Sequence, residues 1–211
     1  LKAIKASGGI EMLKRRIEEA EPDERYVENE TFEYNSLEEA DLTRTDFKFV
    51  RFIGCRFEKC DFSKAGFYNC SFEDCGFIGC IFADSYWKQS SITECRGDGG
   101  DFSLSHWKES KLKDSSFCYG NFSKTSWDNC EIRDCVLCEG FFSESKFKKF
   151  IIRNTNLKGV DFFKTPLKGI DLSECMIENI SVSDSFWELK GVKISPIQAI
   201  DLVQTLGVEF V

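Results

Sequence analysis

Few side chains in this sequence are suited to catalysis. The chain contains one histidine, His106, so a nucleophile that needs an imidazole base has a single candidate partner. Cys135 and Cys138 have the spacing of a zinc-binding pair, but one pair supplies only two of four ligands. Carboxylates are plentiful, yet nothing marks a concave site around them, and no phosphate-binding glycine motif is present. We therefore expect a protein that is not an enzyme and that holds no metal or other cofactor.

The elements that position these side chains follow from a repeat of five residues. Between Phe52 and Phe82 a large apolar residue stands at every fifth position, and a small residue, mostly cysteine, stands two places before it. A helix turns about 100° per residue, so this period scatters the large residues round its circumference. In one continuous strand the odd spacing places them on alternating faces. Short extended segments joined by corners satisfy the pattern, because both residues of each unit then point into a coil.

A longer period of twenty residues gives the number of sides in each coil. The tryptophans of the chain are separated by multiples of twenty: Trp87, Trp107, Trp127 and Trp187. Because stacked coils place like residues beside each other, four units of five make one coil with four sides. We predict an all-β solenoid over residues 30–193, with about eight coils and no insertion that breaks the repeat. Gly97 replaces one large residue, which predicts a loosened coil or a neighbouring side chain in the vacated space.

Short helical caps are expected at both ends. Apolar residues at helical spacing predict a capping helix within residues 1–29, which would cover the first coil. Residues 194–211 form a different element, with Ser195 as a helix N-cap and Gly207 as its stop. Val208–Val211 then reads as a strand.

The apolar face of the C-terminal segment is wider than one solenoid end needs, and this favours a homodimer through the C-terminal cap. The alternative is a cap that folds only on its own last coil. The predicted interface residues are Ile197, Ile200, Leu202, Val203, Leu206 and Phe210.

The repeat resembles that of the pentapeptide-repeat family, in which a small residue, a polar residue, Leu or Phe, and two further polar residues follow one another. Its large central residues run from Phe32 to Val192. The resemblance implies a right-handed quadrilateral β-helix, in which the central residue and the residue two before it face inward.

The cysteines can be sorted by this register. Nine of the eleven occupy the inward small-residue position, where a reduced thiol serves as a compact apolar group: Cys55, Cys60, Cys70, Cys75, Cys80, Cys95, Cys130, Cys135 and Cys175. Cys118 and Cys138 point outward on adjacent coils, as a reactive pair or as two exposed cysteines. Cys135 and Cys138 therefore point in different directions, and His106 points to solvent. The sequence shows no secretory or membrane-spanning apolar run, which favours a cytoplasmic protein.

Charge is also informative once it is sorted by side. The formal net charge of −8 argues against direct nucleic-acid binding. The side that contains Trp87 carries seven outward lysines against four acids, Asp46, Glu109, Asp128 and Glu188, whereas the other three sides sum to −8. The acidic residues predicted to contact a protein partner are Asp41, Asp61, Glu73, Asp74, Glu94, Asp101, Asp114, Glu131, Asp134, Asp161, Asp171 and Glu174.

The inner rows rich in Phe and Cys, and the C-terminal helix that ends in Leu-Gly-Val, resemble the Qnr-type and mycobacterial quinolone-resistance members of the family. That resemblance implies a dimer that binds DNA gyrase or topoisomerase IV and protects it from quinolones or inhibits it. Qnr members of Gram-negative bacteria carry projecting loops, and the unbroken repeat here is more similar to the loopless mycobacterial type. We therefore predict a non-catalytic protein that mimics DNA towards a type II topoisomerase. The alternative is an interaction scaffold or signalling module with another protein partner.

Overall fold

The computed structural model describes Ile17 and residues 25–205. The predicted N-terminal helix lies almost entirely outside the described residues; Ile17 itself is helical and fully buried. In the described part of the chain, every helix is too short or too polar to cross a lipid bilayer.

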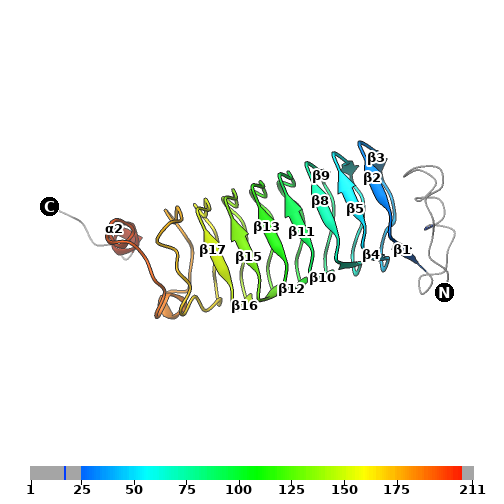
Figure 1. The fold of residues 1–211 in the computed structure, drawn as a ribbon. Coiled ribbons are helices and arrows are strands. Elements are labelled where there is room, and N and C mark those ends of the chain that lie inside the picture. Colours follow the sequence, from blue (N-terminus) through cyan, green and yellow to red (C-terminus); the bar gives the residue numbers. More distant parts are fainter. Residues whose placement is uncertain (1–16, 18–24, 206–211) are drawn as a thin grey trace.

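Coils built on short parallel strands, each three residues long, form most of the molecule (Figure 1). The first side of the solenoid is a sheet of β1 (Tyr26–Glu28), β4 (Asp46–Lys48), β7 (Gly66–Tyr68), β10 (Tyr86–Lys88), β12 (His106–Lys108), β14 (Ser126–Asp128) and β16 (Lys146–Lys148). The second side is a sheet of β2 (Thr31–Glu33), β5 (Arg51–Ile53), β8 (Ser71–Glu73), β11 (Ser91–Thr93), β13 (Lys111–Lys113), β15 (Glu131–Arg133) and β17 (Ile151–Arg153).

The other two sides are less regular. The third side begins as a sheet of β3 (Ser36–Glu38), β6 (Arg56–Glu58) and β9 (Gly76–Ile78), and isolated bridges continue it. The fourth side contains isolated parallel bridges, such as Asp41 with Asp61. Together the four sides make coils stacked along one axis (Figure 1).

The twenty-residue register is confirmed by the strand pairs. Trp87 pairs with Trp107, and Trp107 pairs with Trp127, in parallel strands. The stack begins with Tyr26 opposite Asp46, which is four residues before the expected boundary at residue 30. Each inward side chain thus lies beside the side chain at the equivalent position of the next coil, and these side chains form a continuous core.

Stacked aromatic rings fill that core. The ring centroids of Trp87 and Trp107 are 4.4 Å apart, and those of Trp107 and Trp127 are 4.7 Å apart. Each indole also has a polar partner, because Nε1 of Trp107 donates to Oγ of Ser105 at 2.8 Å, and the other two indoles repeat the arrangement. The small inward position therefore satisfies the N–H group that a buried tryptophan brings.

The space beside Gly97 is filled by a neighbouring ring, which was one of the two expected outcomes. A Cβ atom added at Gly97 would lie 2.5 Å from Cε1 of Phe117. Phe117 also stacks on Phe77, two coils away, with ring centroids 6.4 Å apart. Glycine at this position lets the two phenylalanines close over the gap, so the coil is not loosened.

The prediction of an unbroken repeat is wrong in the last coil. Lys193 is bridged to Asp171, twenty-two residues earlier, whereas all other bridges join residues twenty apart. The two additional residues lie after Ser181, which still bridges Asp161, and before Glu188, whose backbone oxygen accepts from the N–H of Leu167 at 2.9 Å; a 3-10 helix, η2 (Trp187–Leu189), forms at this point. As a result Glu188 is fully buried, and Trp187 is 44% exposed outside the tryptophan column. The expectation that Trp187 continues this column is therefore also wrong.

A helix, α2 (Pro196–Thr205), follows the last coil. Its start has the predicted cap, because Oγ of Ser195 accepts from the backbone N–H of Gln198 at 3.5 Å, and the backbone N–H of Ser195 donates in return to Oε1 of Gln198 at 2.7 Å. Nε2 of Gln198 donates to the backbone oxygens of Leu172 and Cys175, at 2.8 and 2.6 Å. Because the next coil would have supplied backbone N–H groups here, Gln198 stabilises the exposed end of the solenoid. The predicted helix stop and the strand after it lie outside the described residues.

Candidate partner-binding surface

The acidic residues of the fourth side have a structural role. Oδ1 of Asp101 accepts a hydrogen bond from the backbone N–H of Ser103 at 2.9 Å. The same bond is made by Asp41 to Thr43, Asp61 to Ser63, Asp161 to Phe163, and, on the second side, Asp171 to Ser173. Asn121 occupies the same position as these aspartates and bonds Ser123 at 3.1 Å. An uncharged side chain therefore makes the same bond, so these five aspartates act as turn caps.

Hydrogen bonds also hold some of these groups in their charged form. The hydroxyl and backbone N–H of Ser173 lower the pKa of Asp171 below its ordinary value. Partial burial acts to raise the pKa of Asp41, but bonds from Thr43 and Arg25 outweigh it and lower the pKa. Asp41 and Asp171 thus favour the charged form while they cap turns.

The second side carries the other seven predicted acids. Asp74, Glu94, Asp114 and Asp134 occupy the same corner position in four successive coils, and we call these four the corner carboxylates. They line an open hollow of about 460 Å³, together with Arg96. Parallel stacking thus brings together four acids that are twenty residues apart in the sequence.

Each corner carboxylate lies where the backbone turns from the second to the third side. The backbone enters the left-handed region at these residues, with φ of 49° at Asp74 and 56° at Asp134. Aspartate and asparagine tolerate this conformation better than most residues do. The corner therefore both permits these residue types and points them towards solvent.

Basic residues neutralise part of the second side. Asp114 lies 2.9 Å from Nζ of Lys113, and Asp74 lies 3.8 Å from Arg56. Further pairs join Glu73 to Arg51 at 3.5 Å and Glu131 to Arg133 at 2.6 Å. Asp134 instead accepts a hydrogen bond from Asn154 at 2.6 Å. The second side is therefore a mixed ionic surface, in which the corner carboxylates form the longest continuous acidic row.

The residues considered for catalysis are not brought together. Nδ1 of exposed His106 lies 2.7 Å from Oγ of Ser126, on the solvent side of the first sheet. Cys135 is buried and Cys138 is half-buried, in agreement with their expected directions. No cluster of three metal-ligating side chains occurs among the residues that the structure describes.

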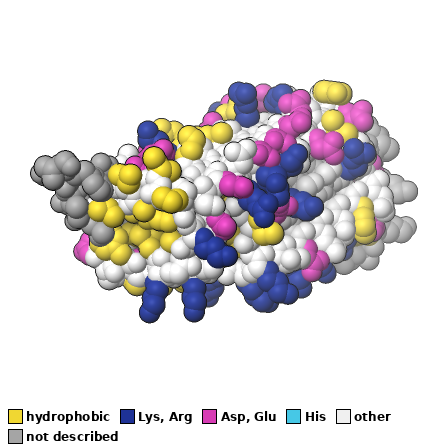
Figure 2. Space-filling model, turned by 60° about the vertical axis from the view of Figure 1, so that its left-hand side comes forward, with side chains coloured by type: hydrophobic (Ala, Val, Ile, Leu, Met, Phe, Trp, Pro, Cys, Tyr) yellow, Lys and Arg dark blue, Asp and Glu magenta, His cyan; other side chains and the backbone are white. Residues whose placement is uncertain are grey.

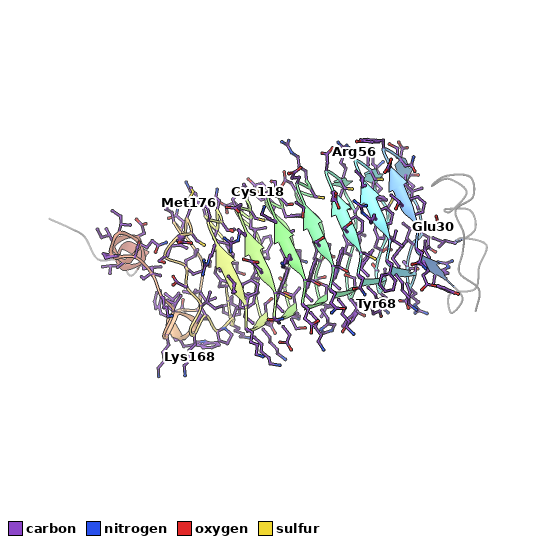
Figure 3. All side chains as sticks on the ribbon, in the orientation of Figure 1. Glu30, Arg56, Tyr68, Cys118, Lys168 and Met176 are labelled. Atoms are coloured by element: carbon purple, nitrogen blue, oxygen red, sulfur yellow. A yellow bond between two sulfur atoms is a disulfide. The ribbon has the colours of Figure 1, made fainter. Side chains whose placement is uncertain are left out.

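The outward cysteines form a pair. Cys118 and Cys138 are joined by a disulfide, with Cα atoms 4.7 Å apart on adjacent coils of the third side, where Figure 3 labels Cys118. The other nine cysteines are buried thiols. Burial raises the pKa of Cys70, Cys130 and Cys135 to about 11, so the reactive thiolate form is suppressed in these three. Thiol chemistry in this molecule is thus concentrated at Cys118 and Cys138.

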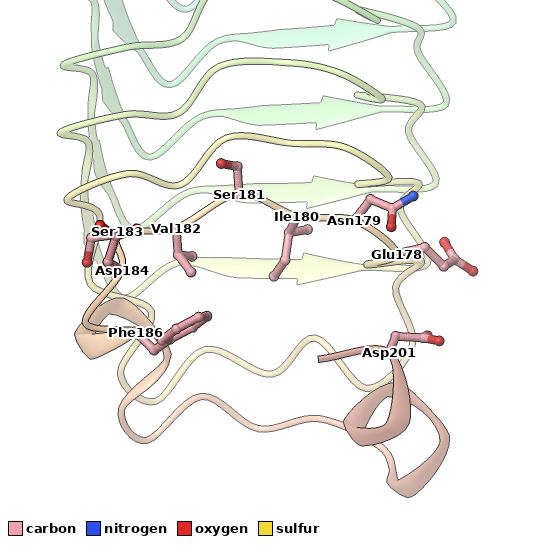
Figure 4. Close-up of a pocket in the computed structure, with 9 residues that line it drawn as sticks. All are labelled: Glu178, Asn179, Ile180, Ser181, Val182, Ser183, Asp184, Phe186 and Asp201. Carbon is pink, nitrogen blue, oxygen red and sulfur yellow. The ribbon is translucent and has the colours of Figure 1, made fainter. Parts of the chain in front are cut away.

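A second hollow lies at the C-terminal end (Figure 4). It has a volume of about 520 Å³ and lies between the segment Glu178–Asp184 and helix α2, with Phe186 and Asp201 in its lining. Its lining contains no pairing of a nucleophile with a base, so we assign it no catalytic role.

Helix α2 presents part of the predicted dimer interface to solvent. Ile197 is 72% exposed and Ile200 is 44% exposed. Leu202 packs against the core of the same chain, and Val203 is half-buried. Leu206 and Phe210 lie outside the described residues. Figure 2 shows apolar side chains gathered near this end of the molecule.

Comparison with known proteins agrees with this architecture. Residues 45–122 match the family model described as the pentapeptide repeat region. A trypsin-treated form of QnrB1, a plasmid-mediated fluoroquinolone resistance protein, has a similar structure, with a TM-score of 0.53 and 21% identity over 89% of this chain and 98% of that chain. A second trypsin-treated form of QnrB1 gives a TM-score of 0.51 and 22% identity over 88% and 97% of the two chains.

A cyanobacterial protein is similar to the same extent. HetL from Nostoc sp. strain PCC 7120 is a pentapeptide repeat protein involved in heterocyst differentiation regulation, with a TM-score of 0.56 and 14% identity over 89% of this chain and 93% of that chain. No curated protein sequence matches the chain.

These matches and the four-sided stack define the class of protein as a pentapeptide-repeat β-solenoid. The family model covers residues 45–122, which is less than half of the chain. At these levels of identity the similarity to QnrB1 and HetL establishes the fold.

Proposed function

We propose that this protein is a non-catalytic, dimeric partner of a type II topoisomerase, DNA gyrase or topoisomerase IV, and that it presents its second side in place of duplex DNA. The observation that carries the proposal is the row of corner carboxylates, Asp74, Glu94, Asp114 and Asp134. Enzymes that hold duplex DNA bind its phosphates with cationic surfaces, and a row of carboxylates complements such a surface.

The spacing of the row suits this role. Stacked strands lie about 4.8 Å apart, so four successive coils place the corner carboxylates along a line of roughly 14 Å. Glu73 and Glu131, on the same side, add charge close to the row, although each is paired with an arginine. The structural likeness to a fluoroquinolone resistance protein, together with the resemblance of the inner rows, supports a topoisomerase as the partner.

Conservative variants test the proposal. We would replace Asp74, Asp114 and Asp134 with Asn and Glu94 with Gln, since Asn is well tolerated in the left-handed conformation. Gyrase supercoiling is measured with and without ciprofloxacin, and binding to gyrase is measured in competition with duplex DNA. We expect the wild-type protein to compete with DNA and to alter supercoiling, and the quadruple variant to lose at least tenfold in apparent affinity.

A matched control changes the net charge equally on other sides. Glu38, Glu39, Glu139 and Glu144 are exposed acids of the third and fourth sides, and all four are changed to Gln. We expect this control to bind gyrase as the wild type does. Equal losses in both variants, or no competition with DNA at all, would remove the basis for DNA mimicry.

Quinolone protection, dimerisation and a cytoplasmic location belong to the same proposal. Exposed Ile197 and Ile200 support a dimer through the C-terminal cap, because an exposed apolar helix face is a common self-association surface. The supercoiling assay with ciprofloxacin tests protection directly, because a protective protein should let gyrase supercoil DNA in the presence of the drug.

A second candidate function is an interaction scaffold or signalling module with a different protein partner. The structural likeness to HetL, a protein of differentiation regulation, favours this alternative. A pull-down that returns one saturable partner other than a topoisomerase, together with no effect on gyrase, would establish it.

A further inference from the structure

The first side of the solenoid carries a row of lysines that occupy the same position in the stacked coils. The register shift in the last coil adds one more lysine to this row. Lys88 stacks on Lys108, followed in the next two coils by Asp128 and Lys148. Bridges of Phe141 with Asp161 and of Asn156 with Met176 keep the twenty-residue register on both flanks, so Lys168 follows Lys148.

The next position would be Glu188 in an unbroken repeat, but the shift replaces it. The backbone N–H of Gly169 donates to the oxygen of Gly191 at 2.8 Å, and a Cβ atom added at Gly191 would lie 3.3 Å from Cγ of Lys168. The register is shifted by two residues on both flanks, at Leu167 with Glu188 and at Asp171 with Lys193, so exposed Lys190 is the counterpart of Lys168, while Glu188 is buried. We call Lys88, Lys108, Lys148, Lys168 and Lys190 the lysine column.

Few acids offset the lysine column. Exposed Lys146 and Lys149 flank Lys148 and add to its charge. Lys148 pairs with Asp128 at 2.9 Å, and no other lysine of the column forms an ion pair within the described residues. The bond from Lys148 lowers the pKa of Asp128, and the charges of Lys108 and Lys149 lower it further, so this carboxylate lies in a positive field.

Figures 2 and 3 agree with this arrangement. Lys168 projects from the lower edge in Figure 3, the edge that also carries Tyr68 of the same side. In Figure 2 basic side chains project from the lower edge of the molecule.

We propose that the lysine column is a second interaction surface, which binds the phosphate backbone of duplex nucleic acid. Five exposed or half-exposed ammonium groups in a straight line, at about 4.8 Å per coil, span roughly 24 Å of a linear polyanion. Lysines bind phosphates as point charges, so the contact is independent of base sequence. The proposal does not depend on topoisomerase binding, since the corner carboxylates lie on a different side.

Two features favour nucleic acid over an anionic membrane. Between His106 and Gly169 the outward residues of this side include no large exposed apolar side chain that could enter a bilayer, and the 44% exposed Trp187 lies only at the end of the column. The cations also follow the long axis of the rod, as a linear polyanion requires.

The acidic net charge does not oppose this binding strongly. Sheets that pack face to face lie about 10 Å apart, whereas exposed charges more than about 8 Å apart are largely screened at physiological ionic strength. The first side can thus attract phosphates although the whole chain carries a net charge of −8.

The test is fluorescence anisotropy with a labelled duplex of twenty base pairs, over a series of salt concentrations. Four phosphate contacts would give a slope of log K against log salt of about −3.6. The variant Lys108→Gln, Lys148→Gln, Lys168→Gln, Lys190→Gln should bind at least tenfold more weakly at low salt, with a flatter slope. The matched control, Lys59→Gln, Lys64→Gln, Lys124→Gln, Lys158→Gln, changes the same charge on the third and fourth sides and should bind as the wild type does.

Tryptophan fluorescence and circular dichroism confirm that both variants are folded, and phosphatidylserine-containing vesicles form a parallel arm. Equal losses in the two variants, or no duplex binding by the wild type, would overturn the proposal. Column-dependent binding to the vesicles without binding to the duplex would overturn it as well.

Discussion

Glu188 is a fully buried acid, whereas the other buried polar side chains are hydroxyls and the amide of Gln198. Its Oε1 accepts from the backbone N–H groups of Lys164 at 2.9 Å and Ser183 at 3.2 Å, and its Oε2 accepts from Oγ of Ser183 at 2.8 Å. Burial acts to raise the pKa of Glu188, but these donors outweigh it and hold the pKa below its ordinary value. The carboxylate thus ties the inserted residues of the last coil to the coil before.

This gives a pH-dependent prediction. Because the folded-state pKa of Glu188 is lowered, its contribution is present at pH values above its ordinary pKa and is lost as the pH falls through the folded-state value. At pH 7 Glu188→Gln should reduce the free energy of unfolding by about 1–3 kcal/mol. Urea unfolding at pH 7 and pH 3 measures this free energy, and the difference between the variant and the wild type should be smaller at pH 3. A gap of unchanged size, or an equal effect of exposed Glu174→Gln, would contradict this role.

At the scale of single elements, the aspartate turns of the fourth side explain why acids recur there. Each turn needs an acceptor for one backbone N–H, and Asp101 and Asn121 provide it in adjacent coils with the same geometry. Nδ2 of Asn121 also donates to Oδ1 of Asp101 at 3.0 Å, so neighbouring turns are linked. The charge of this side is therefore partly a by-product of turn formation.

Substitutions at Asp101 separate the two roles. Asp101→Asn keeps an acceptor for Ser103 and should change the free energy of unfolding by less than about 0.5 kcal/mol, whereas Asp101→Ala should lower it by about 1 kcal/mol. Thermal or urea unfolding distinguishes the two. Equal stability of both variants would show that the turn does not need this bond.

The disulfide of the third side joins two coils at positions twenty residues apart. A cross-link that closes a loop of this length stabilises a fold by roughly 3 kcal/mol, mainly through the unfolded chain. We expect dithiothreitol to lower the urea midpoint of the wild-type protein and to leave that of Cys118→Ser, Cys138→Ser unchanged. The buried thiols supply an internal control, since a thiol assay on the folded protein should detect only the two released groups. A reduced wild type with an unchanged midpoint would contradict the expected stabilisation.

At the scale of the whole molecule, the solenoid presents its longest acidic row and its longest row of lysines on different parts of its surface. The corner carboxylates lie between the second and third sides, and the lysine column lies on the first side. A rod with four flat walls can therefore offer different partners different surfaces at once, which a compact fold of the same size does less readily.

The C-terminal end gives a prediction of assembly. Ile197→Glu with Ile200→Glu changes two exposed side chains of α2 and should halve the mass measured by light scattering, with circular dichroism unchanged. Leu202 is a poor choice for this test because it packs against the core of its own chain. A wild type of monomer mass, or a variant of unchanged mass, would argue against α2 as the interface.

The sequence predicted the repeat well and the surface less well. The period of five and the period of twenty specify which residues face inward, as the tryptophan stack from Trp87 to Trp127 confirms. The partners of the outward residues were not foreseen. Asp101 caps a turn and Asp74 pairs with Arg56, and these different roles follow from the local backbone geometry and from the residues of the neighbouring coil, which the repeat does not specify. The pairing of Cys118 with Cys138 was one of two alternatives that the register left open.

By itself the sequence determined the four-sided coil and its core, since the burial of one large and one small residue in every five leaves no other regular backbone. Only the tertiary structure decided how the last coil ends. Trp187 keeps the spacing of the tryptophan column, yet two extra residues and the hydrogen bonds around Glu188 place it outside and bring Lys190 into register with Lys168. The reason is physical: a periodic pattern specifies positions relative to the coil before, whereas at the end of the stack no following coil holds the chain to that period.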